Sequence, residues 1–273
     1  SQTGGHADSW EICGAHMPGM TDTHPGRPHP IVDSPEEMRK KVRELIRAGA
    51  DVIKVATSGG VLSPLSNPKH AHFRPDELDA LVSEATAADR FVMAHAQGTQ
   101  GIKNAISAGI RSIEHGIYLD DEAIEMMLAA GTYLVPTLMA PLGVLDQVER
   151  GLELPEKVIR IATSVAETHR DSVERAIAAG VKVAMGTDTG VTPHGENLQE
   201  LAEMAKLGMS DDQVLRSSTS VAADLLGVST ELGTVEVGKI ADLVVWEGES
   251  LDVSDMRSRV SAVIQDGSVV VSH

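Results

Sequence analysis

The chain has 273 residues, a length that suits one large domain or one large domain with a small appendage. Hydrophobic residues make up 42% and charged residues 23%, which excludes a mainly disordered chain, and no apolar run reaches the roughly 18 residues of a membrane-spanning helix. The 40 acidic and 23 basic residues give a formal charge of −17, which disfavours binding to nucleic acids and anionic membranes.

A helix is predicted over residues 35–48, because Ser34 is a suitable N-cap, Pro35 fits the first helical position and Glu37 the third. A second helix is predicted over 75–88, where apolar residues recur on one face. Further helical patterns span residues 98–108, 120–130, 155–179 and 197–207. The Pro- and Gly-rich stretch at 14–30 is predicted to be an ordered loop.

Between these helices, a joint from helix to strand recurs five times. It reads AGADVIKVAT at 48–57, AADRFVMAHA at 87–96, AGIRSIEHG at 108–116, AGTYLVPT at 130–137 and AGVKVAMGTD at 179–188. In four joints a glycine follows the helix, as expected for a left-handed C-cap: Gly49, Gly109, Gly131 and Gly180. The short apolar run that comes next is typical of a buried parallel strand. The alternation predicts an α/β protein with a parallel sheet, and by itself it fits a barrel or an open sheet.

The pattern changes after about residue 226. Residues 227–273 alternate polar and apolar positions and end with an Asp-Gly hairpin signal at 266–267, which predicts antiparallel strands outside the main layer. We therefore divide the chain into a main domain at 1–226 and a small β domain at 227–273.

Polar residues occur at or near the ends of four predicted strands: Lys54, His95, His115 and Asp188. The carboxyl ends of parallel strands form the active-site face of α/β proteins, and imidazole and carboxylate groups gathered there are typical metal ligands. Each residue also has a structural interpretation: a hydrogen-bonded histidine, a turn or N-cap aspartate, an ion-paired lysine. Lys54 is the least ordinary, because an ammonium group buried among Val and Ile is costly, so a neutral amine that captures carbon dioxide as a carbamate is expected.

Other features carry less weight. His70 and His72 have the His-x-His form of a ligand pair but fall in a predicted loop, and the HPGRPH segment at 24–29 has the same character. The single cysteine, Cys13, excludes a disulfide framework, fits a reducing, cytoplasmic compartment and has no evident catalytic partner. The chain contains neither a GxGxxG nor a P-loop nor a GxSxG motif.

The segments DVIKVATSGG, MAHAQG, SIEHG, MGTDTGV and GTVEVGKIADLVV resemble the metal-dependent amidohydrolase superfamily, in its imidazolonepropionase-like and Xaa-Pro dipeptidase-like branch. The resemblance implies a (β/α)8 TIM barrel, here from the end of strand 3 to strand 8, with part of a small β-sandwich at the C-terminus. It also implies upstream residues with a first-strand His-x-His pair.

The resemblance implies two divalent metal ions, most often zinc, bridged by carboxylated Lys54. His95 and His115 match the ligands of the second metal. Asp188 matches the carboxylate that holds a metal and accepts the proton of the hydrolytic water. His6 matches a substrate-side histidine, and His194 and Asn197 match the pocket-lining loop. Gln97 stands where dipeptidase-like members have a tyrosine that grips the substrate carboxylate, which leaves amide, carbamate or other acyl substrates open.

The function expected from this resemblance is hydrolysis of an amide or peptide C–N bond by a hydroxide that bridges two metals. The alternatives are a mononuclear deaminase or cyclic amidohydrolase, and a non-catalytic barrel fragment without the first-strand ligands. The expected partner is a small molecule or short peptide, and a homo-oligomer is possible.

Overall fold

The computed structural model describes residues 1–8, 11–12, 15–16, 26, 28–61, 63, 66–149, 151, 153–154 and 156–272. Cys13 and most of the predicted loop at 14–30, including half of the HPGRPH segment, lie outside these residues. In the described part of the chain, no helix has the length and apolarity needed to cross a membrane.

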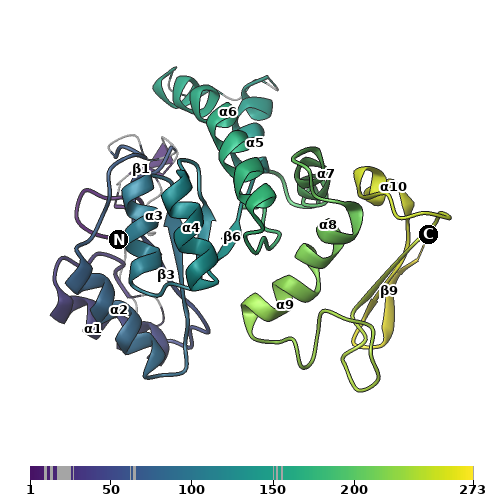
Figure 1. The fold of residues 1–273 in the computed structure, drawn as a ribbon, viewed down its shortest axis with the longest axis horizontal. Coiled ribbons are helices and arrows are strands. Elements are labelled where there is room, and N and C mark those ends of the chain that lie inside the picture. The colour runs from purple at the N-terminus through teal and green to yellow at the C-terminus, as the bar shows by residue number, and fades with distance from the viewer. Residues whose placement is uncertain are drawn as a thin grey trace.

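The centre of the fold is a parallel sheet of four strands that follow one another in sequence order (Figure 1). They are β3 (Ile53–Ala56), β4 (Val92–Ala96), β5 (Ser112–His115) and β6 (Tyr133–Val135). The intervening helices are α2 (Pro75–Thr86), α3 (Thr99–Ser107) and α4 (Asp121–Ala130), and α1 (Pro35–Arg47) precedes β3. This confirms the predicted α/β class with a parallel sheet.

The predicted last strand at 179–188 is only partly formed. Val183 makes an isolated parallel bridge to Leu134, with hydrogen bonds from the Leu134 amide to Lys182 O (2.8 Å) and from the Ala184 amide to Leu134 O (2.9 Å). The run at 179–188 is therefore shorter as a strand than the sequence analysis expected. In the described residues the sheet has four strands and this bridge and does not close, so the closed barrel stays a prediction.

The capping signals identified in the sequence are confirmed at two helix ends. The Ser34 hydroxyl accepts from the Glu37 amide at 3.2 Å and begins α1, as expected of an N-cap. Gly131 ends α4 with φ 69°, in the left-handed region that favours glycine. The helix predicted at 155–179 is α6 (Glu156–Ala179), and the one at 197–207 is α7 (Gln199–Lys206).

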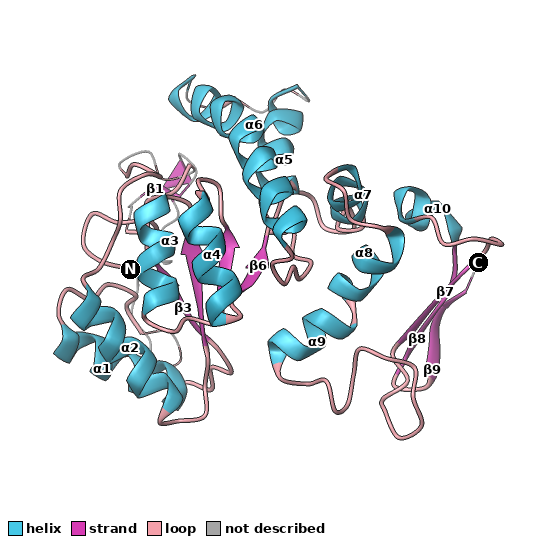
Figure 2. Ribbon diagram, in the orientation of Figure 1, coloured by secondary structure: helices cyan, strands magenta, loops and turns pink. Residues whose placement is uncertain are grey.

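Among the described residues before 227, three helices were not anticipated. They are α5 (Met139–Glu149), α8 (Asp211–Ser218) and α9 (Ser220–Leu226). In Figure 2, α5 and α6 form a pair beside β6, and α7 to α9 follow on the side away from α1. The two small strands near the N-terminus, β1 (Glu11–Ile12) and β2 (Ala15–His16), pair antiparallel.

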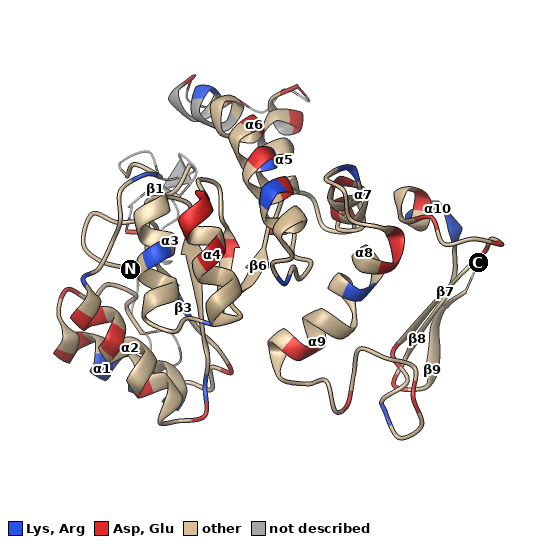
Figure 3. Cartoon of the chain, in the orientation of Figure 1, with Lys and Arg blue, Asp and Glu red and all other residues tan. Residues whose placement is uncertain are grey.

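The hydrophobic core lies between the sheet and its helices. Leu78 and Leu81 of α2, Ile102 of α3 and the strand residues Ile113 and Leu134 are all fully buried within it. The same cluster continues into α7 and α8, and Val253 and Met256 from the C-terminal part of the chain join it. Acidic side chains are scattered over the helices, most visibly on α4 (Figure 3).

The C-terminal part forms a three-stranded antiparallel sheet, β7 (Leu243–Trp246), β8 (Val260–Gln265) and β9 (Ser268–Ser272). The turn between β8 and β9 is Asp266-Gly267, with φ 47° and 76°, which confirms the predicted hairpin. A 3-10 turn, η1 (Val253–Asp255), and α10 (Met256–Arg259) lie between β7 and β8. The division at 226/227 into two domains stays a prediction.

Candidate metal and hydrolase site

Three histidines meet at the carboxyl ends of β4 and β5, and we call them the histidine cluster: His6, His95 and His115. The rings of His6 and His95 stack with centroids 3.9 Å apart and an interplanar angle of 7°. The His115 ring lies edge-on to His95, with a centroid distance of 4.8 Å. Parallel pairing makes β4 and β5 neighbours, but His115 pairs with Ala96 and not with His95. Regular alternation would turn the two rings to opposite faces, and the left-handed backbone of His115 (φ 75°) departs from that alternation. The structure thus brings together three of the residues singled out in the sequence.

Hydrogen bonds orient the two buried rings of the cluster. His95 Nε2 lies 3.0 Å from the carbonyl oxygen of Gly59, so Nε2 carries the proton and donates. His115 Nδ1 lies 2.6 Å from Thr137 Oγ1, whose hydroxyl donates to Pro136 O at 2.7 Å. The Thr137 hydroxyl proton is therefore used, and Oγ1 accepts from His115 Nδ1–H. The remaining nitrogens, Nδ1 of His95 and Nε2 of His115, keep their lone pairs.

Burial keeps the cluster uncharged. The pKa values of His95 and His115 lie well below the ordinary 6.5, first because burial penalises an imidazolium. Burial, followed by the charge of Lys54, lowers the pKa of His6 to about 4. Neutral imidazole is the form that binds a metal, so no proton has to be displaced at neutral pH.

The expectation that Lys54 is buried among Val and Ile is wrong. Its side chain is exposed, whereas Ile53 and Val55 are buried. Successive residues of a strand point to opposite faces, so the two apolar neighbours enter the helix-covered core and Lys54 points to the other side of the sheet. The Lys54 charge nevertheless acts on His6, His95 and His115, which places it on the face of the cluster.

Asp188 lies beyond the Val183 bridge in a left-handed conformation, φ 53°, and is exposed. Its charge acts on Glu114, a residue that the sequence analysis missed. Glu114 is buried, accepts a hydrogen bond from Ser112 Oγ at 2.6 Å, and has its pKa raised by burial to about 7. Strand alternation provided a signal for it, because Glu114 pairs with His95 in register and so shares its face of the sheet.

The structure places the predicted substrate-side residues in different environments. His6 is in the cluster, with Nδ1 at 2.6 Å from Ser63 Oγ. Gln97 is buried, and its side-chain oxygen accepts from the Val61 amide at 3.2 Å. His194 and Asn197 are exposed in the segment that leads to α7.

The two histidines of the weak His-x-His signal separate. His70 is exposed, whereas His72 is buried and close enough to His6 for its charge to lower the pKa of His6.

The donors fit a divalent metal in kind. Neutral imidazoles with a free lone pair and a nearby carboxylate suit zinc. Among the residues that the structure describes, however, no group of three or more His, Cys, Asp or Glu side chains is arranged to hold a metal ion. His95 and His115 would provide two ligands, and Asp188 and Lys54 lie on the same side of the sheet.

Two further groups back the cluster and were not anticipated. His169 of α6 is buried and its Nε2 donates to the His115 carbonyl oxygen at 2.8 Å. Glu200 of α7 is fully buried and accepts from the amides of Leu138 (2.8 Å) and Met139 (2.9 Å). Both residues lie in helices, where the sequence gave no signal of their burial or of their partners.

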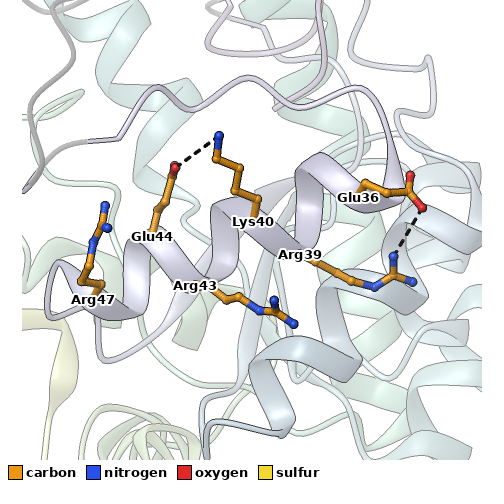
Figure 4. A pocket seen from close by; sticks show the side chains of 6 residues that line it. All are labelled: Glu36, Arg39, Lys40, Arg43, Glu44 and Arg47. Atoms are coloured by element: carbon orange, nitrogen blue, oxygen red, sulfur yellow. Dashed lines mark ion pairs between the residues drawn. The ribbon is translucent and has the colours of Figure 1, made fainter.

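Two cavities elsewhere among the described residues do not offer such chemistry. One hollow of about 460 Å³ lies along α1 and is lined by charged side chains (Figure 4). Its cations have nearby acids: Arg39 lies 3.5 Å from Glu36 and Lys40 4.0 Å from Glu44. Another, of about 730 Å³, lies at the opposite, amino-terminal ends of the strands, next to Arg111 and Tyr133. The active sites of α/β proteins lie at the carboxyl ends of the strands, which favours the histidine cluster as the site.

A parallel α/β sheet with imidazoles at its carboxyl edge has the arrangement typical of an α/β enzyme, whose active site lies at that edge. The chain matches the amidohydrolase family over residues 9–271 and belongs to that family.

Similar proteins share much of the chain. The ochratoxinase of Aspergillus niger is 36% identical over 263 residues, which are 92% of this chain and 54% of that protein. An imidazolonepropionase of Brucella suis biovar 1 is 32% identical over 183 residues, or 65% of this chain and 40% of the relative. The chain thus spans about half the length of the ochratoxinase.

Solved structures agree with this assignment. A Xaa-Pro dipeptidase with bound methionine in the active site superposes with a TM-score of 0.88 at 37% identity, covering 100% of this chain and 66% of that one. A prolidase complexed with N-methylphosphonate-L-proline gives 0.89 at 36% identity, covering 100% and 67%. The resemblance read from the sequence segments is therefore confirmed at the level of the family.

Proposed function

We propose that this chain forms the larger part of a binuclear, metal-dependent hydrolase that cleaves an amide or peptide C–N bond. The observation that carries the proposal is the pairing of His95 and His115: two buried, neutral rings in contact, each with one nitrogen bound to an oxygen and the other free. A structural histidine pair has no need to keep both lone pairs on the same side of a sheet that also carries Lys54 and Asp188.

In this proposal the residues have distinct tasks. His95, His115 and Asp188 would hold the metals together with carboxylated Lys54, and the bound ions would supply Lewis acidity toward the scissile carbonyl and toward water. Asp188 takes the proton of the attacking water and returns it to the leaving nitrogen. His6 is stacked on His95 and anchored at Nδ1 by Ser63, so its Nε2 is free to contact the substrate.

The substrate class follows from the relatives. The names ochratoxinase and Xaa-Pro dipeptidase describe the proteins to which this chain is similar, so ochratoxin and Xaa-Pro dipeptides are the first compounds to assay. Closure of the sheet into a barrel, a C-terminal half of a β-sandwich, a cytoplasmic location and homo-oligomers stay predictions from the sequence.

The decisive experiment measures zinc bound per chain after reconstitution, by atomic emission, together with hydrolysis of this panel. Wild type is expected to bind two zinc ions, and His95→Gln and His115→Gln each to lose at least one. His70→Gln is the matched control, because His70 is an exposed histidine outside the cluster. Unchanged zinc content in both cluster variants would overturn the proposal.

A mononuclear deaminase or cyclic amidohydrolase is the second candidate. It is favoured by the match to imidazolonepropionase and by the exposure of Lys54, which removes the folding argument for a carbamate. One zinc per chain, unaffected by Lys54→Ala, would support it.

A further inference from the structure

The segment Pro136–Met139, directly after β6, has an unusual backbone. Thr137 adopts φ 50°, in the left-handed region that β-branched residues rarely occupy. Such a conformation persists only where the surroundings impose it. The same residue provides the hydroxyl that accepts from His115 Nδ1 at 2.6 Å. The strained residue is therefore also the one that sets the tautomer of His115.

Glu200 imposes the conformation from outside the sheet. Its two carboxylate oxygens accept from the amides of Leu138 and Met139, the two residues that follow Thr137. It lies 61 or 62 positions further along the chain and on a different helix, so it is not a local helix cap. The carboxylate fixes the start of α5 and, with it, the position of the Thr137 hydroxyl.

The burial of Glu200 makes a purely packing role costly. A fully buried carboxylate loses its hydration, and the interactions described for it are two amide donors and the repulsive charge of Glu203. A leucine or methionine would fill the same volume without that cost. What an apolar residue cannot do is hold two adjacent amides in one direction.

From this geometry we propose that Glu200 is a positioning residue for His115: it holds Thr137 in place, and Thr137 fixes the Nδ1–H tautomer that leaves His115 Nε2 free. The relay runs from the Glu200 carboxylate through the backbone of residues 137–139 to the hydroxyl and then to the ring. Its consequence for metal binding rests on the proposed function, whereas the tautomer belongs to the metal-free chain.

The test uses the whole chain, labelled with ¹⁵N-histidine, and reads the ring nitrogens of His115 by NMR without metal, with assignment by His115→Gln. Wild type is expected to show a protonated Nδ1 and an unprotonated Nε2. Glu200→Gln has the same shape, but its amide presents one acceptor and one donor to two donors. It is expected to give a mixture of tautomers and at least about a 10-fold weaker Zn²⁺ affinity by titration with the metal alone.

Controls separate positioning from stability. Glu203→Gln lies on the same helix and removes ion pairs to Arg170 and Lys206, both at 2.6 Å, so it should lower stability and leave the tautomer of His115 unchanged. Thr137→Ala removes the last step of the relay, should produce the same mixture and covers the case in which Glu200→Gln does not fold. Thr137→Ser should restore the single tautomer.

A folded Glu200→Gln variant with the wild-type tautomer overturns the proposal, as does a Thr137→Ala variant with the wild-type tautomer. If wild type binds no zinc, the proposed function fails, while the tautomer comparison still decides the role of Glu200.

Discussion

His169 gives a measurable link between the site and pH-dependent stability. It is buried in α6 and donates to the His115 carbonyl oxygen at 2.8 Å, and burial lowers its pKa to about 4 from the ordinary 6.5. Between these values the unfolded chain binds a proton that the folded chain does not, so stability is lost as the pH falls from about 6.5 to about 4. The difference corresponds to about 3 kcal/mol for this one residue.

The perturbation is His169→Gln, which keeps a donor for the carbonyl but does not titrate. The assay is the free energy of unfolding in urea at intervals from pH 7 to pH 4. Wild type should be more stable than the variant at pH 7, and this advantage should shrink by about 3 kcal/mol by pH 4.

Ser172→Ala is the matched control for this assay. Ser172 lies one turn along the same helix and donates to Ile117 O at 2.8 Å, so its loss should cost about 1 kcal/mol at every pH. If the His169→Gln curve runs parallel to wild type, as the Ser172→Ala curve should, the reasoning about His169 is refuted.

Three other predictions concern neighbouring residues. Lys54→Ala removes an exposed side chain, so the unfolding free energy should change by less than about 0.5 kcal/mol. The zinc content should fall, and kcat should drop by at least about 10²-fold. Full zinc occupancy with normal turnover would mean that Lys54 has only a structural role. Gln97 is tied to the Val61 amide, so kcat/KM should differ little between substrates with a free and an amidated carboxyl end, and a strong preference for the free acid would point to His6 or Arg74. Gly101→Ala would place a Cβ 2.3 Å from Thr57 O, so it should destabilise the protein by about 2 kcal/mol in urea unfolding, despite the better helix propensity of alanine. The loss should be larger than for Gly131→Ala, where no atom lies within 4 Å of the added Cβ.

Local sequence signals were sufficient to predict many of the helices and strands. Ser34 and the glycines after the helices marked where elements begin and end, and the apolar runs between them marked β3 to β6. Features that depend on partners far along the chain could not be predicted from such signals. The 179–188 run forms a single bridge, because what pairs with it beyond Leu134 is not decided by its own residues.

The candidate site shows the same limit. His95 and His115 were identifiable, because a polar residue at the end of an apolar strand is unusual. Their contact depends on the left-handed backbone of His115, which the sequence pattern did not indicate. The burial of Lys54 was misjudged, because the number of apolar neighbours in sequence was read without the alternation of faces. His169 and Glu200 come from helices, where only the three-dimensional packing shows which carbonyl or amide lies opposite.

The origin of these two supports has a consequence for synthesis. The four strands of the sheet, the last of which ends at Val135, leave the ribosome well before His169 and Glu200. A nascent chain halted after β6 therefore contains the whole histidine cluster but neither of the groups that hold the His115 carbonyl and the Thr137 loop. Since domains generally fold as units, we expect the two imidazoles to take their final orientation only after α7 has docked.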